Sequence, residues 1–232
     1  MPIDLASDVR DVRLFHGVER DTLLRLGAKS EREETFAEAM IVAEGDLLDH
    51  LHIIRQGRIE LFACSPRSRT TIALLKPGDC FILAAVVHRA VALMSARTLG
   101  QSTLLHVHAG VFRSALQSDR RLLLNVSMEL GSGFRGMVRN LRDQKLRSAD
   151  QRLAAYLLRL SLEQDNEYEV VLPVRKQLIA SYLGIRSESL SRAFHDLRAI
   201  GVSVKAERVR ISDPAALAQS ANVDQIIDNS TT

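Results

Sequence analysis

Val174–Ile200, VRKQLIASYLGIRSESLSRAFHDLRAI, is the stretch that decides how the C-terminal part of this chain folds. Its first half carries Leu178, Ile179 and Leu183 at the spacing of one helix face. Gly184 predicts the end of that helix, because glycine adopts the positive φ of a helix C-terminus without strain. A second helical pattern follows within a few residues, so the stretch predicts two helices joined by a tight turn.

The second predicted helix has one apolar side and one polar side. Ser187 is suited to cap its N-terminus. Its apolar side is formed by Leu190, Ala193, Phe194 and Leu197. The opposite side carries Glu188, Ser191 and Arg192 on the first turns, where a recognition helix meets base edges in the major groove. The alternative interpretation is a solvated Glu188–Arg192 ion pair worth a few tenths of a kcal/mol.

The spacing of Glu188, Ser191 and Arg192 resembles the E-x-x-S-R motif of the FNR branch of the CRP/FNR family of bacterial transcription regulators. This resemblance implies a TTGAT half-site within an inverted repeat, with Arg192 on guanine, Glu188 on cytosine N4 and Ser191 near thymine. The chemistry agrees, because Arg pairs bidentately with guanine and a carboxylate accepts from the cytosine amine. Candidates for contacts with the DNA backbone are Lys176, Gln177, Ser187, Ser189, Lys205 and Arg208. The implied partners are double-stranded DNA, a second copy of the chain and RNA polymerase.

Composition is that of a soluble, cytoplasmic protein of one or two domains, with 46% hydrophobic residues in 232. Basic and acidic residues balance over residues 1–117, whereas residues 118–210 have an excess of Lys and Arg. That asymmetry suits a sensor joined to a phosphate-binding domain. No apolar run is long enough to span a membrane. Cys64 and Cys80 are too few for a typical iron–sulfur cluster, and no metal site is expected.

Residues 31–108 change to short apolar segments separated by turn residues, which predicts a small antiparallel barrel. The predicted strands are Glu34–Phe36, Met40–Val42, His50–Ile54, Arg58–Phe62, Thr70–Leu74, Val91–Ala96 and Thr103–Val107. The order AEGD, IIRQGRIEL, LLKPGDCF resembles the jelly-roll domain of the same family, so the resemblance covers nearly the whole chain.

The segment that binds cyclic nucleotide in the family departs from the family pattern here. The family places Gly-Glu after the Phe that matches Phe81, and an Arg further on, whereas this chain has Ile82, Leu83 and Ala92. Two charge-assisted contacts of about 1.5–3 kcal/mol each are therefore missing, and cyclic AMP binding is not expected. The effector is unknown. Candidate pocket residues are Phe81, Leu83, His88 and Arg89. Haem is an alternative effector, with His88 as its candidate ligand.

Residues 119–147 predict one long helix with an apolar seam at alternating steps of three and four residues. The seam consists of Leu123, Val126, Leu130, Phe134, Met137 and Leu141. In the family this helix pairs with its twin, which implies a homodimer. The alternative is a helix packed within its own chain. Two shorter predicted segments follow the reading helix as a wing, Val202–Val204 and Val209–Ile211, and the tail beyond Pro214 is expected to be frayed.

The predicted fold class is therefore α+β. Residues 1–117 form a jelly-roll sensor domain, residues 118–147 a dimerisation helix, and residues 148–232 a winged helix-turn-helix domain. An enzyme is the rival class, but no P-loop, G-x-S-x-G or H-E-x-x-H motif occurs, and no catalytic residue is assigned. A regulatory subunit built on the same barrel, without DNA binding, is the more distant alternative.

Overall fold

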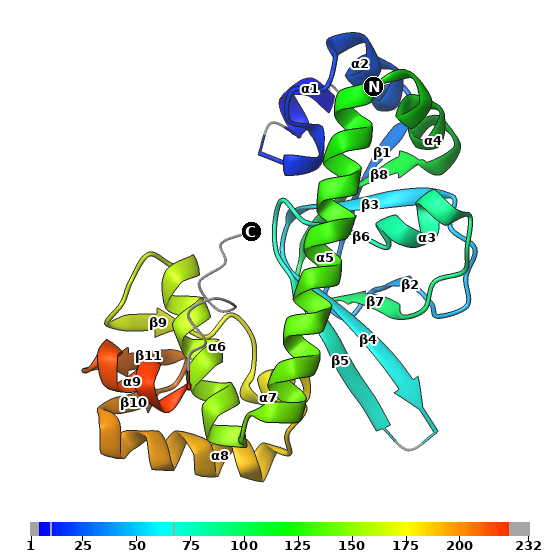
Figure 1. Cartoon of the computed structure of the whole chain (residues 1–232). Coiled ribbons are helices and arrows are strands. Elements are labelled where there is room, and N and C mark those ends of the chain that lie inside the picture. The colour runs from blue at the N-terminus through cyan, green and yellow to red at the C-terminus, as the bar shows by residue number, and fades with distance from the viewer. Residues whose placement is uncertain (1–4, 10, 67, 223–232) are drawn as a thin grey trace. The chain divides into compact units, whose positions relative to one another are not determined.

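The computed structural model describes residues 5–9, 11–66 and 68–222. The chain divides into two compact units, Met1–Gly133 and Phe134–Thr232. The long helix α5, Arg120–Leu146, begins in the first unit and ends in the second (Figure 1). Within the described ranges, none of the helices combines the length and apolar character that crossing a membrane requires.

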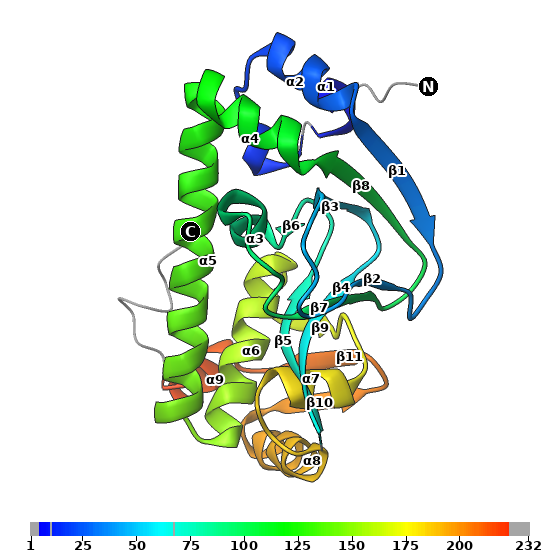
Figure 2. The same cartoon turned by 90° about the vertical axis from the view of Figure 1, so that its right-hand side faces the viewer.

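The first unit contains two four-stranded antiparallel sheets, as the jelly-roll prediction required (Figure 2). One sheet has the order β1-β8-β3-β6 and the other β2-β7-β4-β5. The strands are β1 Ser30–Thr35, β2 Met40–Val42, β3 His50–Gln56, β4 Ile59–Ser65, β5 Ser68–Leu75, β6 Cys80–Phe81, β7 Ser95–Thr98 and β8 Ser102–His108.

The strand predictions need three corrections. The strand predicted at Glu34–Phe36 lies at Ser30–Thr35, so Phe36 is outside it. The short strand β6 was missed, because two residues carry no periodicity. The strand predicted over 91–96 lies at Ser95–Thr98, and Val91 makes only an isolated bridge with Leu47.

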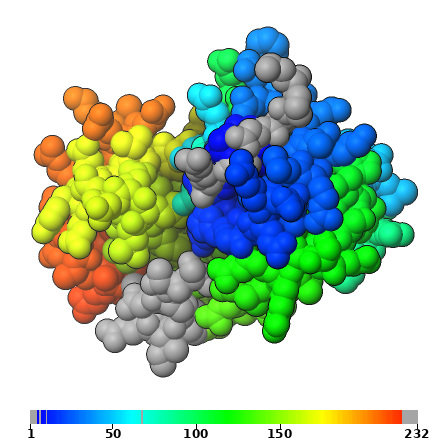
Figure 3. All heavy atoms as spheres, turned by 90° about the horizontal axis from the view of Figure 1, so that it is seen from above, coloured from blue at the N-terminus to red at the C-terminus, as the bar shows by residue number. Residues whose placement is uncertain are grey.

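Two apolar cores lie on opposite faces of the first sheet. On β3, Leu51 and Ile53 face a core shared with helices, whereas Ile54 faces the core between the two sheets. This follows from the alternation of side chains along a strand. The helices of this unit are α1 Leu5–Asp8, a 3₁₀ turn at Arg13–Phe15, α2 Arg20–Gly27, α3 Leu83–His88, α4 Ala109–Ser118 and the start of α5. Figure 3 shows the N-terminal helices, in blue, beside the green chain of α4 and α5.

The described part of the second unit combines four α-helices, α6 to α9, with a small sheet. It contains α6 Ala149–Glu163, β9 Glu169–Val171, α7 Lys176–Tyr182, α8 Ser187–Asp196, a 3₁₀ turn at Leu197–Ile200, β10 Val202–Lys205, β11 Arg208–Ile211 and α9 Pro214–Ser220. The sheet has the order β10-β11-β9, so the predicted wing is present.

The prediction of a frayed tail is wrong for its first part. Asp213 caps α9 by accepting from the amide of Ala216 at 2.9 Å, and Leu217 and Ala221 are buried in the core of the second unit. Burial of these two apolar side chains stabilises α9 although the residues around them are mostly polar. The rest of the tail, residues 223–232, lies outside the described residues.

Candidate nucleic-acid interface

The turn between α7 and α8 has the geometry that Gly184 predicted. Its φ is +64°, and the amide of Ile185 donates to the carbonyl of Ala180 at 3.0 Å, which closes the C-terminus of α7. Ile179, Ala180 and Leu183 are buried in the core of the second unit, together with the apolar side of α8, and Leu178 is also buried. The two helices therefore pack as the sequence predicted.

Arg152, on α6, also holds this turn, and the sequence pattern did not single it out. Its Nη1 donates to the carbonyl of Leu183 at 2.8 Å, one of the carbonyls that a helix leaves without an internal partner. This contact fixes where α7 ends and therefore where α8 begins. The two residues are separated by 31 positions in the chain, so only folding brings them together.

The polar face of α8 is open to solvent. Glu188, Ser191 and Arg192 are all exposed, and the Ser191 hydroxyl donates to the carbonyl of Ser187 at 3.1 Å. In the described part of the chain neither Glu188 nor Arg192 has an ion-pair partner, so the i,i+4 ion pair is absent. Their charged groups are free to meet another molecule.

One helix boundary differs from the prediction. Arg186 occupies the N-cap position of α8 with extended backbone angles, and Ser187 is the first helical residue. The Arg186 side chain makes no capping hydrogen bond, and the amide of Leu190 is the first to donate within the helix, to the Arg186 carbonyl at 2.9 Å. The amides before Leu190 therefore depend on solvent or a ligand. Ser187 is not the cap that the sequence predicted, although it remains exposed on the same end of the helix.

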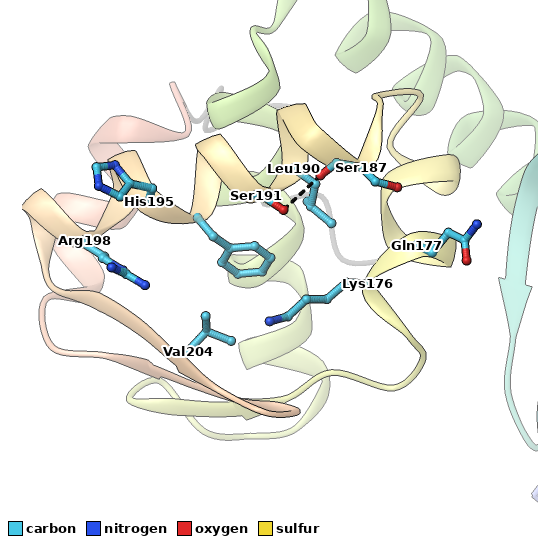
Figure 4. Close-up of a pocket in the computed structure, with 9 residues that line it drawn as sticks. Lys176, Gln177, Ser187, Leu190, Ser191, His195, Arg198 and Val204 are labelled. Atoms are coloured by element: carbon cyan, nitrogen blue, oxygen red, sulfur yellow. Dashed lines mark hydrogen bonds between the residues drawn. The ribbon is translucent and has the colours of Figure 1, made fainter.

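A basic hollow of about 440 Å³ lies beside α8 (Figure 4). It is lined by Lys176, Gln177, Ser187, Leu190, Ser191, Phe194, His195, Arg198 and Val204. The Lys176 ammonium lies 5.4 Å from the centre of the Phe194 ring, a cation–π contact. In Figure 4 the side chains of Lys176 and Arg198 extend toward each other from opposite ends of the hollow. Two cations and several hydroxyl and amide groups suit a phosphate.

The structure brings only some of the predicted backbone contacts to this hollow. Lys176, Gln177 and Ser187 line it, whereas Ser189 is half-buried outside it. Arg198 and His195 line it without having been predicted. The helical spacing of His195, four residues after Ser191, was the available indication.

The two wing residues lie elsewhere. Lys205 and Arg208 form a cross-strand pair on the face of the hairpin opposite Val204, which lines the hollow. Arg208 also donates to Glu169 at 2.7 Å, an exposed ion pair that competes with any phosphate only weakly.

The four candidate effector residues do not converge on one pocket. Phe81 lies in the core between the sheets, and Leu83 packs in the core on the helix side. His88 and Arg89 are exposed at the end of α3. The four candidates are divided because Phe81 lies on β6, Leu83 on the buried side of α3, and His88 and Arg89 at the exposed end of α3.

No cluster of metal ligands exists in the ranges 5–9, 11–66 and 68–222, where no three His, Cys, Asp or Glu residues are placed to hold an ion. Cys64 is exposed, and burial raises the pKa of the Cys80 thiol to about 12. A thiol with so high a pKa supplies little thiolate, the form that binds metals.

Helix α5 keeps a long apolar side exposed. Phe134, Met137 and Leu141 of the predicted seam are exposed, as is Leu123. Val126 is 2% exposed and packs in the helix-side core of the first unit, so its place in the seam was wrong. Leu130 also packs partly against that core. Four further apolar residues on α5 are exposed but were not part of the predicted seam: Leu124, Met128, Val138 and Leu146.

Two family models match the chain. One is described as a Crp-like helix-turn-helix domain and covers residues 151–220, and the other as a cyclic nucleotide-binding domain and covers residues 34–119. The first contains all of α7, α8 and the wing, and the second contains most strands of the two barrel sheets.

Relatives of known role match across both units. The CRP-like cAMP-activated global transcriptional regulator of Mycobacterium tuberculosis is 22% identical over 214 residues, which are 90% of this chain and 96% of that protein. The nitrogen fixation regulation protein FixK of Rhizobium meliloti is 27% identical, over 78% of this chain and 83% of its own. The solved structure of FixK2 from Bradyrhizobium japonicum has the same fold, with a TM-score of 0.76 at 17% identity, covering 84% of this chain and 98% of that one.

Proposed function

Because the chain belongs to the CRP/FNR family of DNA-binding transcription regulators, we propose that it acts as a homodimer that recognises a TTGAT inverted repeat through α8. The relatives are regulators and not enzymes. The observation that carries the proposal is the exposed set Glu188, Ser191 and Arg192 on the first turns of α8, where neither charged group forms an ion pair with a described residue.

Each of the three residues has a base partner in the proposed half-site. The Arg192 guanidinium donates to O6 and N7 of guanine, the Glu188 carboxylate accepts from cytosine N4, and Ser191 lies near thymine. The basic hollow beside α8 takes a backbone phosphate between Lys176 and Arg198, which sets the register of the helix in the groove.

A dimer is required because an inverted repeat has two-fold symmetry. The exposed apolar side of α5 supplies the surface, since an exposed apolar stripe of this length is costly unless it is covered. Gly131 lies on this side of α5, because it is seven residues from both Leu124 and Val138. A Cβ built on it would meet no atom of the described residues within 4 Å, so this part of the surface is open.

We propose three functional parts: a sensor domain over 1–117, a dimerisation helix over 118–147 and a DNA-binding domain over 148–232. RNA polymerase is proposed as a further partner on the family resemblance alone. Haem has no supporting observation, since His88 is exposed at the end of α3 and the apolar residues near it pack in two separate cores.

The test of the proposed function is binding to a fluorescent duplex that carries the TTGAT inverted repeat. We expect a Kd at least 10³-fold lower than for a scrambled duplex at physiological salt, the ratio typical of specific regulators. Equal affinity for the two duplexes would refute sequence-specific reading by α8. Measuring both Kd values over a range of salt concentrations separates the phosphate contacts from the base contacts. Phosphate contacts make the affinity for both duplexes fall equally as salt rises.

The sensor domain is expected not to bind cyclic AMP, although the M. tuberculosis relative is named as cAMP-activated. Ala92 is 1% exposed in the core between the sheets and has no charge to offer a phosphate. Leu83, at the position of the family's Glu, packs in the other core. Calorimetry with cyclic AMP should show no binding tighter than about millimolar. A micromolar isotherm would show that other residues hold the nucleotide.

A further inference from the structure

Four of the seven histidines lie on two neighbouring strands of the first unit. His50 pairs with His108 and His52 with His106 in the antiparallel register of β3 and β8. Because side chains alternate along a strand, all four lie on the face that carries Ile54 of the core between the sheets. Neither the DNA-reading surface nor the family's nucleotide site uses them.

Two of these histidines form a hydrogen-bonded chain with a carboxylate. Nε2 of His106 lies 2.8 Å from Oε2 of Glu33 on β1, and Nδ1 of His106 lies 2.7 Å from Nδ1 of His52. A carboxylate only accepts, so Nε2 of His106 carries a proton and its Nδ1 is the acceptor. His52 must then donate from Nδ1. The arrangement fixes one tautomer for each neutral ring.

His52 sits in an apolar environment. Its ring stacks on Phe81 of β6 with the centroids 5.0 Å apart and 18° between the planes, and the residue is 8% exposed. Burial, reinforced by the nearby His106 and His50, lowers the pKa of His52 to about 3. Burial also lowers the pKa of His106, against the opposing effect of Glu33.

We propose that the first unit senses protons, with the Glu33–His106–His52 chain as the proton-binding site and the His52–Phe81 contact as the part that responds. When both histidines are neutral, the hydrogen bond between their rings holds His52 in the core. A proton added at Nδ1 of His106 opposes two N–H groups across 2.7 Å. A proton added at Nε2 of His52 places a charge in an apolar core, which is costly without water. Both costs disappear when His52 leaves the core.

The direction of the response follows from linkage. The closed form keeps His52 neutral, whereas a form that exposes the ring lets it titrate near the ordinary value of about 6.5. As the pH falls through that value, the open form binds the proton and the closed form does not. At pH 5 this favours opening by about thirtyfold for each histidine exposed.

The charged groups around Glu33, His106 and His52 do not cancel the preference for the open form at low pH. On β1, Glu31 and Glu33 both favour a proton on His106, but burial remains the largest influence on it. His50 and His108 add no negative charge. On β6, Phe81 faces His52, and the neighbouring Cys80 pairs with Ile53 and faces the helix side. The opposite sheet presents Ile59, Leu61 and Ala96 to this core, all apolar.

Phe81 connects the histidines to a strained part of the backbone. The next residue, Ile82, has φ +62°, a value that a β-branched residue rarely adopts. Helix α3 begins directly after it, and its Val86 carbonyl accepts from Nη1 of Arg113 on α4 at 3.0 Å. Loss of the His52–Phe81 contact therefore releases strain at Ile82 and loosens α3 against α4.

Hydrogen exchange of the full chain, read by mass spectrometry at pH 7.5 and pH 5, tests this proposal without using DNA. Labelling times are scaled for the pH dependence of chemical exchange. We expect the segments 50–54, 80–88 and 103–108 to lose protection by about thirtyfold at pH 5. In His52→Phe, which keeps the stacked ring and leaves no N–H to oppose a proton on His106, the loss should be below about threefold. His88→Gln, a change at an exposed histidine, should behave like the wild type.

His52→Gln provides a second variant in case the phenylalanine does not fold, because its amide keeps an N–H donor for His106. Unchanged protection of the wild type at pH 5 would overturn the proposal. So would an equal loss in His52→Phe or His52→Gln, or the disappearance of the response in His88→Gln. The result is independent of the DNA target, so the proposed function and this inference fail separately.

Discussion

Replacing Phe134 and Leu141 together with Glu is expected to convert the proposed dimer to a monomer and to weaken binding to the proposed inverted repeat by about 10²–10⁴-fold. Both side chains are exposed on α5, at 69% and 56%, so the substitutions do not disturb the core of their own chain. In a dimer they would place four carboxylates in an apolar interface, where each unpaired buried charge costs several kcal/mol. A monomer then loses the tethered second reading head.

Light scattering measures the mass, and fluorescence anisotropy measures the affinity for the inverted repeat and for a single half-site. Leu162→Glu is the matched control, because Leu162 is 72% exposed on α6 and not on α5. The control should remain dimeric with unchanged affinity. A double variant that stays dimeric and binds the repeat normally would remove α5 as the interface. Val126 is unsuitable for this experiment, since its replacement would open the core of the first unit.

Arg192→Ala is expected to cost about 1–3 kcal/mol on the TTGAT repeat, roughly five- to 150-fold in Kd, and to abolish the preference for guanine at its position. The side chain is exposed and forms no ion pair with a described residue, so the substitution breaks no ion pair within the described part of the chain. The measurement compares the wild type and the variant on the TTGAT duplex and on a duplex with that guanine replaced. The loss should appear on the first duplex only.

Lys176→Ala is the matched control, because a phosphate contact positions the protein on DNA without distinguishing one base sequence from another. Lys176 lies in the basic hollow, so its loss should weaken both duplexes equally and reduce the salt dependence by about one phosphate contact. If Arg192→Ala also weakened both duplexes equally, Arg192 would be a phosphate contact and the motif assignment would fail. A loss of affinity on only one duplex in Lys176→Ala would show that Lys176 does not act through a phosphate contact alone.

Much of the fold was predictable because its determinants are local. Gly184 ends α7 at the predicted residue, since the positive φ of that turn depends on one residue type. The polar start of α8 is exposed as its periodicity required. The long helix, α6 and the wing hairpin also follow from short-range patterns. The errors at β6 and α9 occurred where an element is too short, or its composition too polar, for periodicity to indicate it.

The candidate site divides in the same way. Glu188, Ser191 and Arg192 were predicted from spacing alone, because the first turns of one helix set their relative positions. Arg198 reaches the hollow through the fold around Phe194 and Val204, and no pattern in the sequence indicated it. The four effector candidates are not brought together, because Phe81 on β6 and Leu83 on α3 pack in different cores and His88 and Arg89 are exposed at the end of α3.

By itself, the sequence determined the order of the barrel, the long helix and the helix-turn-helix, the turn between α7 and α8, and the exposed polar residues at the start of α8. Those features depend on intervals of a few residues, where helix and strand geometry leave little choice. Only the tertiary structure decided that Val126 is buried while Phe134 is exposed, and that Arg152 closes the turn at Leu183. It also brought His52 within 2.7 Å of His106, across 54 positions of the chain. These contacts join residues that are distant in sequence. Their free energies depend on which apolar and polar groups the complete fold buries away from water.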